Sequence, residues 1–90
     1  MTTDELFIKN QTLSHEFSLY LFEHPDIAER IPHDAQVILL PKNDPELCRE
    51  NMKLSQAQRE PKQPVVYVHV DKIKPARSRL VHPELEIIPQ

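Results

Sequence analysis

The side chains with the clearest chemical potential are cations in a basic, proline-marked segment, residues 72–79, that follows an apolar run. Ammonium and guanidinium groups that converge on one anion add their contributions, as they do on the phosphates of nucleotides and nucleic acids. The topology predicted below adds a lysine and a histidine from the ends of two strands. The candidate anion-binding residues are Lys42, His69, Lys72, Lys74, Arg77 and Arg79. The simpler alternative is a solvated loop that pairs with nearby carboxylates.

The histidines and the single cysteine offer weaker chemistry. His15 and His24 are too far apart in sequence to share one helical face at metal-ligand spacing, and the other histidines form no closer pair. His69 has the unperturbed pKa of a general base, but a half-buried packing role is the simpler interpretation. Cys48 lies in the first turn of a predicted helix, where the dipole favours a thiolate, yet it shares an apolar line with Met52. We therefore predict no catalytic residue, no metal and no cofactor.

The composition excludes the common phosphate-binding loops. The chain of 90 residues contains no glycine and nine prolines, so the Walker and dinucleotide glycine patterns are both absent. Its net charge is −3, but residues 1–50 carry ten acidic and four basic side chains (−6), and residues 51–90 carry four and seven (+3). A chain this acidic is a poor general binder of nucleic acid, although a local basic loop could still contact one.

The cysteine content and the first residues indicate the compartment. Cys48 has no second cysteine to pair with, and residues 1–5 lack the basic and apolar segments of a secretory signal. No apolar stretch approaches the roughly 18 residues that a membrane span requires. We therefore expect a cytoplasmic protein that makes no membrane contact.

The middle of the chain predicts a strand, a helix and a second strand. Apolar runs at residues 35–40 and 65–70 are typical of strands, and residues 46–59 follow a helical pattern. Asp44 is a favoured N-cap and Pro45 suits the first helical position. A connection of this length predicts that the two strands are parallel neighbours, with their carboxyl ends at one edge of the sheet.

The N-terminal part predicts two helices. The first helix ends by Glu23, because Pro25 disfavours helical geometry at the preceding residue. Its start is open between Asp4 and Thr12, since either residue is a suitable cap. Residues 25–31 predict a short second helix that Pro32 ends.

These elements predict a single small α/β domain of two or three layers. It comprises a helical N-terminal part (residues 1–34), the strand–helix–strand unit (residues 35–70), and a basic loop with an edge strand (residues 71–90). The edge strand is predicted at residues 85–88, where Pro89 ends it. A chain near this length buries only about 60 to 65 per cent of its unfolded surface, so the core must be small.

Several short segments between Leu13 and Leu85 resemble a known group of sequences. They are Leu19-Tyr20-Leu21-Phe22, His24-Pro25-Asp26, Ile31-Pro32, Val37-Ile38-Leu39-Leu40-Pro41, Asp44-Pro45-Glu46-Leu47, Pro64-Val65-Val66-Tyr67-Val68 and Arg77-Ser78-Arg79-Leu80. In these segments the chain resembles short, uncharacterised prokaryotic proteins classed as a family of unknown function. The resemblance implies a free-standing cytoplasmic microbial protein and assigns no activity.

So few elements leave exposed edges and apolar faces, which self-association would cover. The second strand has an aliphatic face, and the first helix carries apolar residues around more than one face, namely Leu19, Leu21 and Phe22. We therefore predict a homodimer and interpret the chain as a small non-enzymatic α/β binding or regulatory module that contacts proteins. The alternative is a small enzyme or a binding domain for an anionic ligand, a nucleotide or nucleic acid, at the carboxyl edge of the strands.

The anion hypothesis predicts that replacing Arg77 and Arg79 together by Ala weakens binding and leaves folding intact. Exposed cations contribute about 0–1 kcal/mol each to stability, whereas their phosphate contacts are additive. Titration of the wild type with short DNA, RNA and nucleotides should show affinity that falls steeply with salt. Absence of binding, or binding that the double substitution leaves unchanged, would remove the anion hypothesis.

Overall fold

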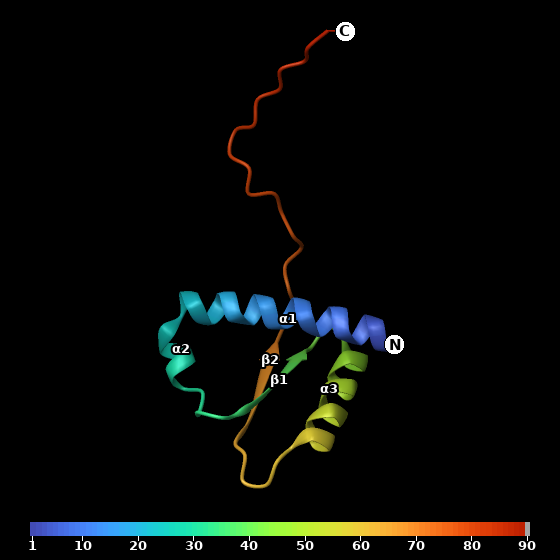
Figure 1. Ribbon diagram of the computed structural model, residues 1–90, viewed down its shortest axis with the longest axis vertical. Coiled ribbons are helices and arrows are strands. Elements are labelled where there is room, and N and C mark those ends of the chain that lie inside the picture. Colours follow the sequence, from blue (N-terminus) through green and yellow to red (C-terminus); the bar gives the residue numbers. More distant parts are fainter. Residues whose placement is uncertain (90) are drawn as a thin grey trace.

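The computed structural model describes residues 1–89 and forms a small α/β domain from which the C-terminal residues extend (Figure 1). In chain order the elements are α1 (Thr3–Glu23), α2 (Pro25–Glu29), β1 (Gln36–Pro41), α3 (Pro45–Gln58) and β2 (Val65–Val70). The small α/β class predicted from the sequence is confirmed. The strands and α3 lie within one residue of their expected bounds, and α2 is two residues shorter.

Helix α1 is continuous, so the longer of the two alternatives is correct. Its cap is Thr2, whose side-chain oxygen accepts a hydrogen bond from the Glu5 amide at 3.1 Å. The helix passes through Thr12, whose hydroxyl donates to the Ile8 carbonyl in the preceding turn. It ends at Glu23, before the His24–Pro25 pair, as expected. None of the helices in residues 1–89 has both the length and the apolar character needed to cross a bilayer.

The two strands form a parallel pair, as predicted. Gln36 is opposite Val65, and the register continues without a bulge to Pro41 opposite Val70. The Gln36 amide donates to Pro64 and the Lys42 amide donates to Val70, each at 2.7 Å, which marks the two ends of the ladder. Because backbone groups alternate in direction along a parallel strand, those of Leu39 and Pro41 point away from β2.

Helix α3 packs along β1 and binds the backbone groups on its outer edge. The Asn51 side-chain amide donates to the Leu39 carbonyl at 2.8 Å, and the Cys48 thiol donates to the Pro41 carbonyl at 2.9 Å. Proline is tolerated at this last position because an outward-facing strand residue needs no amide donor. The outer edge of β1 is therefore covered and partly hydrogen-bonded by side chains from the crossover helix.

A second contact of Asn51 joins α3 to α1. The side-chain amides of Asn10 and Asn51 donate to each other, at 2.8 and 2.9 Å. Beside them lies the core cluster of Leu13, Leu39 and Leu47, one residue from each of α1, β1 and α3. The partly buried residues that pack against it are Leu6, Phe17, Val37 and Val68. The core is as small as the chain length predicts.

The predicted third strand is wrong. Residues 71–89 contain no helix or strand and run away from the domain (Figure 1). Leu85, Ile87 and Ile88 are 79–90% exposed, because no neighbouring strand supplies partners for their backbone or side chains. With this extension the radius of gyration is 18.1 Å, against about 12 Å for a compact chain of this length. We call residues 71–89 the tail.

Replacing the buried Asn51 by Ala should lower the free energy of unfolding by about 2–4 kcal/mol, because it leaves the Leu39 carbonyl and the Asn10 amide without their partner. Urea denaturation followed by circular dichroism measures the loss. The control is Gln56→Ala on the exposed face of the same helix, which should change stability by less than about 0.5 kcal/mol. A loss for Asn51→Ala as small as that of the control would contradict this account.

Candidate binding groove

The structure distributes the six candidate anion-binding residues over three places. Lys42 follows β1 and its ammonium lies 3.3 Å from the Asp71 carboxylate, which follows β2. This pair confirms that the segments after the two strands share one edge of the sheet. His69, Lys72 and Lys74 lie beside a groove next to that edge. Arg77 and Arg79 lie farther along the exposed tail.

The N-terminus of α3, the other part of the expected anion site, is occupied by the chain's own carboxylates. One oxygen of Asp44 accepts from the Leu47 amide at 3.2 Å, and the other is 2.8 Å from the Lys9 ammonium. The hydrogen bond from Lys9, with that from Leu47, lowers the pKa of Asp44 below its usual 3.8. Glu46 is bonded to the amino group of Met1 at 2.7 Å, which lowers its pKa as well.

The structure places Cys48 and His69, the two side chains weighed as a nucleophile and a general base, apart from each other on α3 and β2. Burial, followed by the nearby Asp44 charge, raises the pKa of the Cys48 thiol, so the protein holds it as a neutral donor to the Pro41 carbonyl. His69 is exposed on β2. Among residues 1–89, no three His, Cys, Asp or Glu side chains are grouped closely enough to hold a metal ion.

A groove of about 900 Å³ lies between β2 and the two N-terminal helices. We call it the β2 groove. Figure 1 shows α1 lying across the end toward which the strands point, with α2 turned down beside them. Its lining comes from four parts of the chain: Leu13, Glu16, Phe17 and Tyr20 of α1; Ile27, Arg30 and Ile31 in and after α2; Leu39 of β1; and Val66, Val68, His69, Val70, Asp71, Lys72, Ile73 and Lys74 of β2 and the tail.

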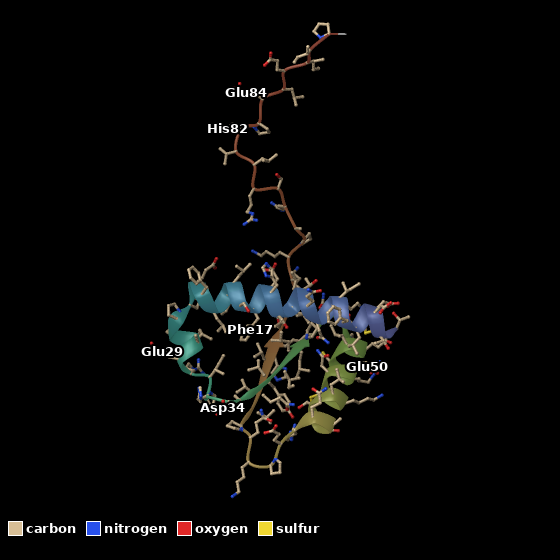
Figure 2. All side chains as sticks on the ribbon, viewed as in Figure 1. Phe17, Glu29, Asp34, Glu50, His82 and Glu84 are labelled. Carbon is tan, nitrogen blue, oxygen red and sulfur yellow. The ribbon has the colours of Figure 1, made fainter. Side chains whose placement is uncertain are left out.

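The floor of the β2 groove is aliphatic because side chains alternate along β2. Val66, Val68 and Val70 share one face, while Tyr67 and His69 project from the other. All three valines are only half-buried. Phe17 lies between α1 and the strands and packs against the core (Figure 2). The groove therefore presents apolar surface that the chain itself does not fully cover.

The rim of the β2 groove is charged, with an excess of cations. Arg30, Lys72 and Lys74 contribute positive charge, and Glu16 and Asp71 contribute negative charge. The Asp71 charge is already paired with Lys42. An apolar floor with a cationic rim suits an extended ligand that combines apolar and acidic side chains better than it suits a bare phosphate.

The sequence alone located the floor of this groove but missed its walls. The alternation in β2 identified the aliphatic face. The apolar residues of α1 and α2 have helical spacing, but periodicity does not reveal which strand a helix will face. Only the close approach of α1 to β1 and of α1 to α2 assembles the groove around β2.

Comparison with known proteins identifies a family. The chain matches the sequence model described as "Family of unknown function (DUF5647)" over residues 5–83, which includes every residue that lines the β2 groove. No curated protein and no solved structure matches the chain significantly.

The Lys9–Asp44 pair predicts an acid-sensitive contact between α1 and α3. Because the folded-state pKa of Asp44 is depressed, its contribution is complete above the unfolded value of 3.8 and is lost as the pH falls through the folded value. Asp44→Asn keeps a capping side chain but loses the charge. We expect this variant to melt below the wild type at pH 7, and the difference to shrink toward pH 3.

Thermal melts at both pH values test this expectation. The control is Lys53→Met, which removes an exposed pair with Glu50 within α3 and joins no two elements. It should leave the melting temperature nearly unchanged, since exposed pairs within one helix contribute little. An Asp44→Asn deficit of equal size at pH 3 and pH 7 would show that the charge is not responsible.

Proposed function

The chain belongs to this family of unknown function, and we propose that it is a small non-enzymatic binding module whose β2 groove holds an extended segment of a protein. The observation that carries the proposal is the half-buried aliphatic floor of the groove beneath a charged rim. Apolar surface of this kind contributes roughly 25 cal/mol per Å² when a partner removes it from water.

The free edge of β2 supports a protein rather than a small molecule as the partner. In residues 1–89 the sheet has two strands, and α3 covers only the edge formed by β1. The backbone groups of Val65, Tyr67 and His69 point to the other edge, because those of alternate residues bond β1. An open strand edge is a template for pairing with another extended chain.

Exposed apolar residues on the helices also favour protein contacts. Phe7 and Ile8 in α1 are 67% and 60% exposed, and Phe22 at the end of α1 is 86% exposed. Large apolar side chains left this exposed favour contact with a protein partner. The proposal therefore includes self-association as a homodimer. It also includes a cytoplasmic setting, in which the lone Cys48 remains a thiol.

A display library of random twelve-residue peptides, panned against the wild type, should enrich apolar sequences that include acidic residues. Ile73→Asp places a negative charge at the groove, in a residue outside every helix and strand. This substitution should raise the dissociation constants of the enriched peptides by about tenfold or more, which is the loss expected for one buried apolar side chain.

The control for this experiment is Phe22→Asp, which removes an exposed apolar residue that does not line the groove. Circular dichroism should show the wild-type spectrum for both variants. The proposal fails if the enriched peptides bind Ile73→Asp as tightly as the wild type, because their site would then lie elsewhere.

A further inference from the structure

We infer that the β2 groove is filled by the C-terminal tail of a second copy of this chain, so that two copies exchange their tails reciprocally. The inference rests on the proposed function and names its ligand. The segment that docks is residues 80–88, and it would enter the partner's groove as an extended strand.

The composition of the tail suits a bound state. Five large apolar side chains in residues 80–88 are 75–90% exposed, namely Leu80, Val81, Leu85, Ile87 and Ile88. All of residues 71–89 are exposed, and the tail carries His82 and Glu84 well clear of the domain (Figure 2). A segment with this apolar content is unlike a solvated linker, which is poor in such residues.

Charge complementarity selects the groove as the place where the tail docks. The only acidic residues in 80–88 are Glu84 and Glu86, and the segment has no lysine or arginine. The groove rim has more basic than acidic residues: Arg30, Lys72 and Lys74 against Glu16 and Asp71. Glu84 and Glu86 are two positions apart, so they share one face of an extended strand, and Leu85 and Ile87 share the other. One face can therefore meet the floor while the other meets the rim.

The start of the tail directs it to a second copy and away from its own domain. Ile73 and Lys74 still line the chain's own groove. Pro75 has a fixed φ and holds Lys74 extended, so the chain continues outward from this point. An extended segment from residue 75 to residue 88 spans about 43 Å at about 3.3 Å per residue. This length is enough to reach the groove of a neighbouring domain.

The size of the exchanged contact is sufficient for a stable dimer. Each copy would contribute both the lining of its groove and the nine residues of its tail segment. This total is close to the roughly 20–30 residues per side of a standard interface. Reciprocal exchange is isologous, so the assembly closes at two copies and leaves no unfilled groove.

The first test measures the mass of the full-length protein by light scattering from 1 to 100 μM. The wild type should have twice the 10.6 kDa mass of one chain. Leu85→Asp with Ile87→Asp should raise the dissociation constant at least about a hundredfold, because each of two tails loses two apolar contacts. The control Gln11→Asp with Gln56→Asp adds the same two charges at exposed positions of α1 and α3 that do not line the groove, and it should leave the dimer unchanged.

The second test exchanges charges between tail and rim. Lys72→Glu with Lys74→Glu should weaken the dimer, and so should Glu84→Lys with Glu86→Lys. Combining all four substitutions should restore most of the lost affinity, because opposite charges again face one another. All four positions are exposed, so each variant should retain the wild-type circular dichroism spectrum.

The outcomes separate this inference from the proposed function. A wild type of single-chain mass at every concentration overturns the tail exchange. So does a dimer that survives Leu85→Asp with Ile87→Asp, or charge variants whose losses add without any rescue. If the dimer survives Leu85→Asp with Ile87→Asp but dissociates in Ile73→Asp, the groove binds a different segment and the proposed function stands. If Ile73→Asp neither dissociates the dimer nor weakens the selected peptides, both proposals fail.

Discussion

The structure depends on the buried amide of Asn51. Its side chain bonds the Leu39 carbonyl and exchanges two hydrogen bonds with Asn10, so one residue fastens α3 to the outer edge of β1 and to α1. These hydrogen bonds are necessary for stability. A buried amide without partners lowers the free energy of unfolding by more than a satisfied amide raises it. The cluster of Leu13, Leu39 and Leu47 packs without directional contacts, whereas the hydrogen bonds of Asn51 are directional. Asn51 therefore helps to position α1, which forms a wall of the β2 groove.

This arrangement makes the two edges of the sheet unequal. The crossover helix covers β1 with polar side chains that bond its free carbonyls. No equivalent element covers β2 within residues 1–89. Because both the free edge and the aliphatic face belong to β2, the unsatisfied surface of the sheet is concentrated on one strand. Concentrated surface of this kind favours a specific partner over general adhesion.

The structure places the cations of the candidate anion site in different surroundings. Residues 72–79 form a basic segment, which the sequence combines with the N-terminus of α3 in one predicted anion site. That N-terminus already carries the carboxylates of Asp44, which caps it, and of Glu46. Lys72 and Lys74 instead border an apolar groove, where the ligand of matching character is an extended segment with acidic and apolar side chains. In the function that we propose, the same charges support protein recognition, since electrostatic complementarity sets specificity and register at an interface.

The sequence by itself determined the local elements and the parallel pairing. Prolines and capping residues set the helix ends, alternation identified the aliphatic face of β2, and the length of the crossover required parallel strands. The helix ends and the aliphatic face depend on neighbours in sequence, and the parallel pairing follows from the length of the connection between two consecutive strands. Tertiary structure alone decided that α1 and α2 enclose a groove over β2 and that residues 85–88 pair with no strand in residues 1–89. Both depend on contacts between distant residues, and an apolar alternation shows that a segment can pair without showing which strand it meets.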